Sequence, residues 1–303
     1  MAPHRDPPDE RARAWSDGLR RELASRLGPA AARAVWVTGS VGRGEAVPGS
    51  DLESLAVVDD HGDPGDRAVR RAVASTDLSR APWFAETSPA SAADPRLIRT
   101  PAGWSTAADD WADSPARDLG VVHLGLLADA RPLVDGHSDP ELLPRLAARS
   151  VRTHPAILAD ILADALSTRA SVPSRLTRTF RSDPVVDLKA TVLTPVVKLA
   201  RWAALRAGVT STSTDSRLRL AADPEVLPAD RWESLRAAAR FTARLRWEVR
   251  LRAGSDGPGT DRFPLSGLTT VERAGLRSAA REIAGAQRTL DYLRSSGELR
   301  EPG

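Results

Sequence analysis

The sequence contains no cysteine, and its 303 residues include only one methionine and one tyrosine. Without thiols the chain cannot form a disulfide, a zinc–thiolate centre or an iron–sulfur cluster, and it has no thiol nucleophile. Its five histidines do not have the spacing of metal ligands. Any chemistry therefore depends on carboxylates, hydroxyl groups and cationic side chains.

Long apolar runs are also missing. No stretch reaches the roughly 18 consecutive apolar residues that indicate a membrane span, and the opening residues MAPHRDPPDERARAW lack the apolar segment of a signal peptide. We therefore expect a cytoplasmic protein with no membrane partner. The sequence pI of about 10.0 accompanies a formal net charge of only +3, which is weak support for nucleic-acid binding, so we expect no nucleic-acid partner.

Lysine is almost absent, since Lys189 and Lys198 are the only two among 43 basic residues. On a predicted helix over residues 184–207, Lys189 falls within an apolar face and Lys198 on the opposite face. A lysine in an apolar face needs an anionic partner, because burying an unpaired ammonium group is costly. Lys189 is therefore a candidate to bind phosphates or an interface carboxylate, whereas Lys198 is expected to be a solvated surface charge. Pro195 should kink this helix.

The order of β-prone and helical segments predicts an α+β fold with two domains. Helices are expected over residues 9–27 and 66–75 and around Trp104 and Trp111, and strands over 34–38, 51–58 and 119–134. From residue 139 onward the long segments have helical periodicity, over about 139–150, 154–170, 184–207, 228–253 and 268–295. Residues 1–150 should form a domain with a small mixed sheet, and residues 151–303 an all-α helical bundle.

The most informative segment connects the first two predicted strands. It contains GSVGRGE from Gly39 to Glu45, and Asp51-Leu52-Glu53 opens the following strand. Because side chains alternate along a strand, Asp51 and Glu53 should point to one face, with Cα atoms roughly 6.5–7 Å apart. Two carboxylates there repel each other unless a cation joins them, and Mg²⁺ binds proteins through one or two carboxylates plus substrate phosphates. The alternative is a pair of solvated charges on an edge strand.

The glycine-rich turn supplies the complementary part of such a site. At Gly39 and Ser40, backbone N–H groups and a hydroxyl can approach a polyphosphate closely. The third predicted strand ends in Asp129, whose carboxylate would complete a cluster with Asp51 and Glu53 that holds two divalent ions, Mg²⁺ or alternatively Mn²⁺. Two ions can stabilise the attacking and leaving oxygens of an in-line displacement at phosphorus. Asp129 would then be a ligand of the second ion or a base; otherwise it is a turn residue at a strand end.

These motifs resemble those of a known superfamily. A GS turn followed after about ten residues by D-x-D or D-x-E on a strand is similar to the signature of polymerase-β nucleotidyltransferases, and GSVGRGE with Ser50-Asp51 resembles their PII-uridylyltransferase branch. The spacing of Trp104 and Trp111 and the segment DARPLVDG at 129–136 are also similar to that branch. Further motifs resemble its helical substrate-binding domain, namely DLK at 187–189, LAR at 199–201, Ser213-Thr214 with Arg217-Leu218, and Leu245-Arg246.

The resemblance, which extends over about residues 25 to 295, implies a nucleotidyltransferase. Such an enzyme moves a nucleoside monophosphate from a nucleoside triphosphate, here UTP by resemblance, to an acceptor hydroxyl on a protein and releases pyrophosphate. It implies catalytic and metal-binding roles for Asp51, Glu53 and Asp129. The implied nucleotide-binding residues are Gly39, Ser40, Arg43, Lys189, Thr214 and Arg217. A purely structural ion-pair network is the alternative for Lys189, Thr214, Arg217 and Arg246.

The sequence departs from the family pattern at Glu53, where the usual residue is a second aspartate. Glutamate moves the carboxylate outward by one methylene group. A catalytically silent relative, retained as a nucleotide-sensing or partner-binding module, is therefore the main alternative function. Nucleotidyl transfer to a small molecule or to an RNA end is another. The chain has no HD dipeptide, so the phosphohydrolase activity of full-length uridylyltransferases is not implied.

Overall fold

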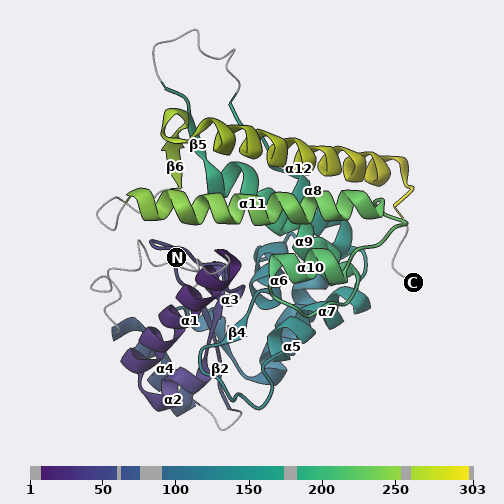
Figure 1. Ribbon diagram of the computed structural model, residues 1–303. Coiled ribbons are helices and arrows are strands. Elements are labelled where there is room, and N and C mark those ends of the chain that lie inside the picture. Colours follow the sequence, from purple (N-terminus) through teal and green to yellow (C-terminus); the bar gives the residue numbers. More distant parts are fainter. Residues whose placement is uncertain (1–7, 60–62, 76–90, 174–182, 254–260, 300–303) are drawn as a thin grey trace. The chain divides into compact units, whose positions relative to one another are not determined.

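The computed structural model describes residues 8–59, 63–75, 91–173, 183–253 and 261–299 (Figure 1). The chain divides into two compact units. The residues up to Ile157, together with Thr210–Ser213, belong to the first unit, and the second contains Leu158–Val209 and most of the chain from Thr214 onward. Among the helices in these described ranges, none combines the length and the apolar character needed to cross a membrane.

The first unit is built on a four-stranded mixed sheet. Its strands are β1 (Val35–Thr38), β2 (Glu53–Val57), β3 (Ile98–Arg99) and β4 (Arg131–Pro132), in the spatial order β3-β2-β1-β4. Strand β1 pairs antiparallel with β2 and with β4, whereas β2 and β3 are parallel. The register places Thr38 opposite Glu53 and Val37 opposite Arg131. The end of the central strand therefore lies between the start of β2 and the residues that precede β4.

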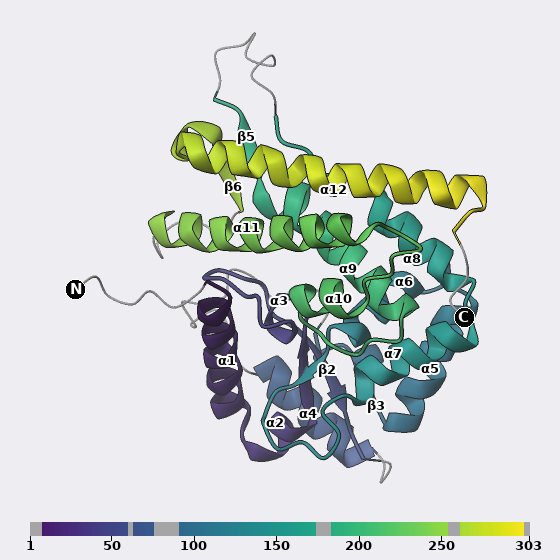
Figure 2. The same ribbon diagram turned by 45° about the vertical axis from the view of Figure 1, so that its right-hand side comes forward.

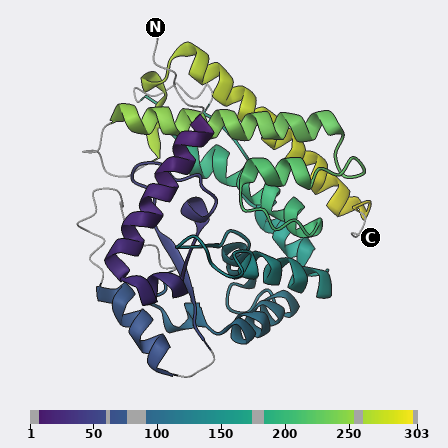
Figure 3. The same cartoon turned by 60° about the horizontal axis from the view of Figure 1, so that its bottom comes forward.

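Helices cover this sheet. They are α1 (Pro8–Leu27), α2 (Pro29–Ala34), the single turn α3 (Gly39–Gly42), α4 (Asp63–Ser75), α5 (Pro101–Asp113), α6 (Gly120–Ala128) and α7 (Leu142–Thr153), with a short 3₁₀ turn, η2 (Pro95–Leu97). Helix α1, purple in Figure 3, packs against α2 and α3 and contributes Leu19 and Leu23 to a core shared with Val35 and Val37. Helices α5 and α7 lie side by side (Figure 2).

Capping and an indole hydrogen bond fix α5 against the sheet. The Thr100 hydroxyl accepts a bond from the backbone N–H of Gly103, and Pro101 occupies the first turn, where its missing N–H is not needed. The Nε1 group of Trp104 donates to the backbone oxygen of Ala56 on β2 at 2.9 Å. The predicted helix around Trp104 and Trp111 is confirmed, and both indoles are buried.

The strand expected over residues 119–134 is wrong. Residues Gly120–Ala128 form helix α6, and only Arg131–Pro132 join the sheet as β4. The segment is apolar almost throughout instead of alternating, and periodicity alone does not distinguish such a run from a buried helix. Asp129 therefore follows a helix, and its backbone N–H bonds to the oxygen of Gly125 at 3.2 Å.

The second unit is helical apart from one small ribbon. Its helices are α8 (Ile157–Leu166), which starts at the boundary of the two units, α9 (Thr194–Arg206), α10 (Thr214–Leu220), α11 (Ala229–Ala253) and α12 (Thr270–Ser296). Strands β5 (Val185–Asp187) and β6 (Arg262–Pro264) pair antiparallel, and the 3₁₀ turn η5 (Leu265–Gly267) follows. The α+β fold class is thus confirmed, with a sheet in the N-terminal part and a helical C-terminal part.

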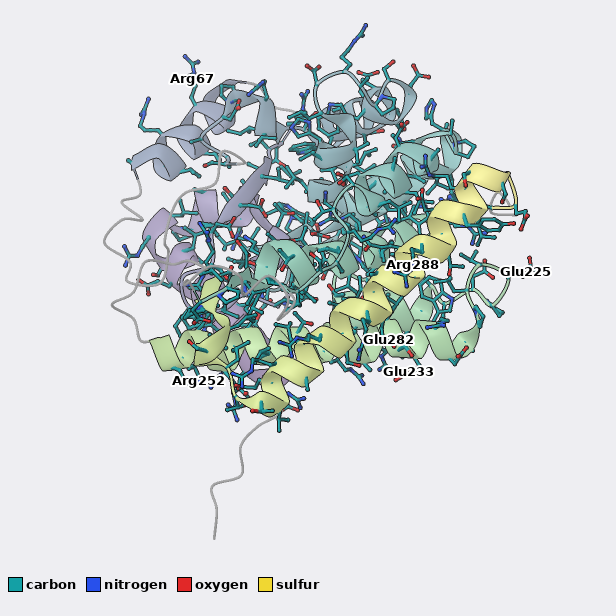
Figure 4. The ribbon with its side chains drawn as sticks, turned by 90° about the horizontal axis from the view of Figure 1, so that it is seen from above. Arg67, Glu225, Glu233, Arg252, Glu282 and Arg288 are labelled. Atoms are coloured by element: carbon teal, nitrogen blue, oxygen red, sulfur yellow. The ribbon has the colours of Figure 1, made fainter. Side chains whose placement is uncertain are left out.

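The two longest helices of this unit, α11 and α12, pack against each other and cross at an angle (Figures 1 and 4). Exposed ion pairs join them, Arg231 with Glu282 at 3.2 Å and Arg252 with Glu272 at 2.7 Å; Arg252 and Glu282 are labelled in Figure 4. Helix α12 begins with a capping box, in which the Thr269 hydroxyl and the Glu272 carboxylate each accept a bond from the other residue's backbone N–H.

The helix expected over residues 184–207 is only partly correct. The segment opens with β5, continues as a π-helical turn, η4 (Lys189–Leu193), and becomes the α-helix α9 at Thr194. Pro195 lies in the first turn of α9, which continues directly from the π-helical turn, so the proline stands within one helical run. The predicted kink stays a prediction. The short helix α10 was not predicted.

Candidate active site

The candidate site begins where β1 ends. All four residues of β1 are buried, and at Gly39 the backbone adopts a φ of +59°, in the left-handed region that glycine adopts without strain. The chain then makes the single turn α3, in which the N–H of Arg43 bonds to the oxygen of Gly39 at 3.0 Å. The glycine-rich segment thus forms a turn at the end of the central strand, as the sequence indicated.

The carboxylate of Glu53 lies over this turn. Glu53 is the first residue of β2 and pairs with Thr38 across the antiparallel register. A Cβ atom added to Gly39 would lie 1.6 Å from Oε2 of Glu53, so the carboxylate occupies the space that a side chain at position 39 would need. Glycine is required here both by its dihedral angle and by this close approach.

Ser40 contributes a buried hydroxyl group to the turn. Its side chain is 8% exposed, and within the described ranges its Oγ has no hydrogen-bond partner. Most buried hydroxyl groups are bonded, and leaving one unpaired costs about 1–3 kcal/mol. An unsatisfied serine hydroxyl in a glycine turn is suited to binding a ligand oxygen.

Asp129 approaches the same turn from a distant part of the chain. It is 1% exposed, and a Cβ atom added to Gly42 would lie 2.2 Å from its backbone oxygen. The Thr38 hydroxyl donates to the backbone oxygen of Leu126 at 2.5 Å, which holds the last turn of α6 to β1. Glu53 and Asp129 therefore flank the end of β1 on its two sides.

Arg43 joins the turn to Asp129. Its Nη1 lies 2.5 Å from Oδ2 of Asp129, and its Nε lies 2.8 Å from Oε2 of Glu45. Burial acts to lower the pKa of the Arg43 guanidinium, but the charges of Asp129 and Glu45 outweigh it and raise the pKa. The guanidinium is therefore a permanent cation held between two carboxylates.

Serine side chains fix the loop that leads from the turn to β2. The fully buried Ser16 of α1 accepts a bond from the N–H of Ala46 at 3.0 Å and donates to the oxygen of Ala12 at 2.7 Å. Ser50 accepts from the N–H of Val47 at 2.9 Å. These bonds position the chain immediately before Asp51.

Asp51 and Glu53 are both half-buried, but strand alternation does not place them, because β2 begins at Glu53 and Asp51 precedes it. The part of the chain that the structure describes contains no group of three or more His, Asp or Glu side chains that could hold a metal ion. In this structure the Asp129 carboxylate is paired with Arg43. The assignment of the three carboxylates as metal ligands stays a prediction.

The other predicted nucleotide-binding residues lie in the second unit. Lys189 opens the π-helical turn and is half-buried, and Thr214 and Arg217 of α10 are 5% and 1% exposed. Arg246 forms a two-point ion pair with the buried Asp261, at 2.7 and 2.9 Å. Arg246 therefore takes part in a buried ion pair of its own unit. The nucleotide-binding roles of Lys189, Thr214 and Arg217 stay predictions.

Several cations converge on Asp261. Burial acts to raise the pKa of the Asp261 carboxyl group, but the hydrogen bonds and charge of Arg246 outweigh it, so the pKa is lowered. The charges of Arg250 and Lys189 act in the same direction. Lys189 thus lies near a carboxylate of its own unit.

The expectation that Lys198 is a solvated surface charge needs correction. Lys198 is not simply solvated, because its Nζ lies 2.7 Å from Oδ1 of Asp164 and its side chain is 26% exposed. On α11, Arg236 and Arg240 both bind the carboxylate of Asp215, at 2.7 and 2.6 Å. These partners are distant in sequence: Asp164 lies on α8 and Lys198 on α9, and α10 packs on α11.

Sequence reasoning missed the partners of Arg43. The pairing of Arg43 with Asp129 joins residues 86 positions apart, and no local pattern reveals it. The arginine–glutamate spacing in GRGE was the one available signal for Glu45. Also unpredicted is a separate pocket of about 510 Å³ in the same unit, whose lining includes Arg99, Trp111, Arg117 and Asp118.

Comparison with known protein families gives a match in the C-terminal half of the chain. Residues 155–293 match the protein-family model described as "Putative nucleotidyltransferase substrate binding domain". This segment lies in the helical part of the chain and does not include the turn at Gly39. No curated protein matches the chain.

Proposed function

We propose that this protein is a metal-dependent nucleotidyltransferase that moves a nucleoside monophosphate from a nucleoside triphosphate to an acceptor hydroxyl group. The observation that carries the proposal is the turn at the end of β1. There the buried hydroxyl of Ser40, which has no hydrogen-bond partner among the described residues, adjoins a glycine covered by the Glu53 carboxylate. This turn combines a donor for phosphate with an oxygen ligand for a cation. The family match of residues 155–293 supports the same class of enzyme.

The turn residues are assigned to bind the triphosphate. The Ser40 hydroxyl would donate to a phosphate oxygen, which satisfies a group that has no other partner in the part of the chain that the structure describes. Gly39 allows the backbone to approach the ligand because it has no side chain. Arg43 carries a guanidinium on the same turn, and guanidinium groups bind phosphate oxygens in a two-point geometry.

Asp51 and Glu53 are assigned to hold Mg²⁺, for which Mn²⁺ would substitute. The donor set fits, because both side chains are half-buried carboxylates and one or two carboxylates suffice when substrate phosphates supply further oxygens. Glutamate suits position 53, since its additional methylene group lets the carboxylate extend over Gly39. When bound, the ion would stabilise charge on the reacting phosphate.

The transfer forms one bond between the acceptor oxygen and the α-phosphorus and breaks the bond to the departing pyrophosphate. Asp129 is assigned to the acceptor side, as a metal ligand or as the base that takes the hydroxyl proton. By resemblance the donor is UTP and the acceptor a hydroxyl on a protein. Lys189, Thr214 and Arg217 stay candidate nucleotide-binding residues of the second unit.

A thermal-shift titration of the full chain with each nucleoside triphosphate, with and without Mg²⁺, tests this proposal. We expect a stabilisation that requires Mg²⁺ and is lost in Asp51→Ala and Glu53→Gln, because each change removes a ligand charge. Asp59→Ala is the matched control, since Asp59 is an exposed aspartate beyond the other end of β2. Incubation with α-phosphate-labelled nucleotide and candidate acceptors then measures transfer.

The outcomes separate the proposed functions. Mg²⁺-dependent binding with label in a protein fraction supports protein nucleotidylation, whereas label in a small-molecule or RNA fraction assigns another acceptor. Binding that needs no Mg²⁺, is unaffected by Asp51→Ala and gives no transfer would replace the proposal with the catalytically silent nucleotide-sensing module. No binding of any triphosphate would overturn both.

A further inference from the structure

Arg43 is shared by two carboxylates that belong to different parts of the first unit. Its Nη1 contacts Asp129 at 2.5 Å and its Nε contacts Glu45 at 2.8 Å. The side chains of Arg43, Asp129 and Glu45 are 10%, 1% and 20% exposed. The Asp129 carboxylate is therefore covered, and the guanidinium of Arg43 lies against it as a neutralising charge.

Arg43 also belongs to the turn that carries the unsatisfied hydroxyl. Ser40 and Arg43 are three residues apart on a helical turn, so their side chains leave the same side of it. A phosphate bound to the Ser40 hydroxyl would therefore compete with Asp129 for the guanidinium. Arginine binds phosphate at two points and at full charge, so a triphosphate is a strong competitor for a single carboxylate.

We propose that Arg43 exchanges partners when a nucleoside triphosphate binds: its guanidinium breaks the ion pair with Asp129 and binds the phosphates instead. The exchange releases the Asp129 carboxylate to bind a divalent cation. The exchange rests on the proposed function and adds an order of assembly to it. Before the nucleotide binds, the ion pair prevents Asp129 from acting as a metal ligand. Afterwards the buried carboxylate needs a new positive partner, because an uncompensated buried charge is costly, and a divalent cation supplies one.

The physical consequence is that Arg43 opposes metal binding in the absence of nucleotide. If Arg43 had a purely structural role, its removal would instead weaken the binding of both the metal ion and the nucleotide at the turn. Glu45 also affects the exchange, because it accepts a hydrogen bond from Nε of Arg43 and so restrains the guanidinium from moving away from Asp129. No covalent bond changes in the exchange.

Binding of Mn²⁺ to the full chain, measured by the electron paramagnetic resonance signal of the free ion, tests the exchange. Without nucleotide, Arg43→Met is expected to bind a Mn²⁺ ion about tenfold more tightly than the wild type, the effect of exposing one charged oxygen ligand. The double variant Arg43→Met/Asp129→Asn should lose this gain. Affinity for a non-hydrolysable triphosphate should fall about tenfold in Arg43→Met, as expected for one lost charge-assisted contact.

The control is Arg145→Met, which removes an arginine–aspartate pair with Asp139 in an exposed part of the same unit and should change neither affinity. If Arg43→Met does not fold, Glu45→Gln provides the test. It leaves Asp129 covered but loosens Arg43, and it should raise triphosphate affinity about threefold; an unchanged or lower affinity would overturn the exchange.

The readouts separate this inference from the proposed function. If the wild type binds a triphosphate together with Mn²⁺ but Arg43→Met gains no Mn²⁺ affinity without nucleotide, the exchange is wrong and the enzyme class stands. If the gain appears but survives Asp129→Asn, the released ligand is not Asp129 and the exchange is again wrong. If the wild type binds no triphosphate, the proposed function fails and the exchange fails with it.

Discussion

The carboxylate of Glu53 lies directly over the Cα atom of Gly39, where a Cβ atom would meet Oε2 at 1.6 Å. The two residues come from neighbouring strands, since Glu53 opens β2 and Gly39 follows the last residue of β1. The absence of a side chain at position 39 is what allows a carboxylate to reach the turn. The contact therefore joins the proposed phosphate-binding and metal-binding parts of the site.

Gly39→Ala is expected to destabilise the protein through two separate effects. Placing a side chain in the left-handed region costs about 1–2 kcal/mol, and overpacking against Glu53 costs a further 1–3 kcal/mol or so. Gly136→Ala is the matched control, because Gly136 has a φ of +78° but no atom within 4 Å of the added Cβ. Urea unfolding should therefore show a larger loss for Gly39→Ala than for Gly136→Ala.

The difference between these two variants measures the contact with Glu53. Equal losses would mean that the Glu53 side chain moves away at no cost and that its position over the turn is not enforced. Triphosphate binding should be lost in Gly39→Ala and retained in Gly136→Ala, which thermal-shift titration of the folded variants can determine.

Ser40→Ala is expected to separate binding from stability. Removing a buried hydroxyl that has no partner should leave the free energy of unfolding within about 0.5 kcal/mol of the wild type or raise it. Affinity for a Mg²⁺–triphosphate should fall about threefold to tenfold, the effect of one hydrogen bond. Ser16→Ala is the contrast. Removing its buried and hydrogen-bonded hydroxyl should lower the free energy of unfolding by about 1–3 kcal/mol. A large stability loss in Ser40→Ala would show that the hydroxyl has a structural partner.

The sequence predicted the part of the fold that depends on local pattern. Strand β1, the glycine turn, the start of β2 and the long amphipathic helices follow from composition and periodicity, because each has a clear period or a turn residue. Helix α6 was mistaken for a strand because its residues are apolar on nearly every side, which removes the periodic signal. The π-helical turn at Lys189 has no sequence signature of its own.

The candidate site shows the same limit. Gly39, Ser40, Asp51 and Glu53 are near one another in sequence, so the motif alone grouped them. The partner of Arg43 could not be predicted, because Asp129 comes from the end of α6 and reaches the turn only through the packing of Gly42 on its backbone. Whether a carboxylate is grouped with others or paired with an arginine is decided by such tertiary contacts.

Breaking the buried ion pair of Arg246 and Asp261 should destabilise the protein more than breaking an exposed ion pair of the second unit. Arg246→Met is expected to lower the free energy of unfolding by about 3–5 kcal/mol, because it leaves a buried carboxylate without its two-point partner. Arg252→Met removes the half-exposed ion pair with Glu272 and should lower the free energy of unfolding by no more than about 1 kcal/mol. Denaturant unfolding of both variants checks this, and equal losses would contradict a structural role for Arg246.

His123 should make the first unit less stable in mild acid. Its ring stacks on Trp111 at 4.6 Å between centroids, and burial, with a smaller contribution from Arg96 and Arg99, lowers its pKa below the usual 6.5. The folded state therefore favours the neutral ring, so its contribution to stability is present above pH 6.5 and is lost as the pH falls through the folded pKa.

His123→Phe isolates this effect, because phenylalanine keeps an aromatic ring against Trp111 but cannot take up a proton. As the pH falls below 6.5, the thermal midpoint of the wild type should drop more steeply than that of His123→Phe at constant ionic strength. Other groups titrate equally in both proteins, so the difference between the two slopes reports the histidine alone. Identical slopes would show that the ring takes up its proton equally easily in the folded and unfolded chains.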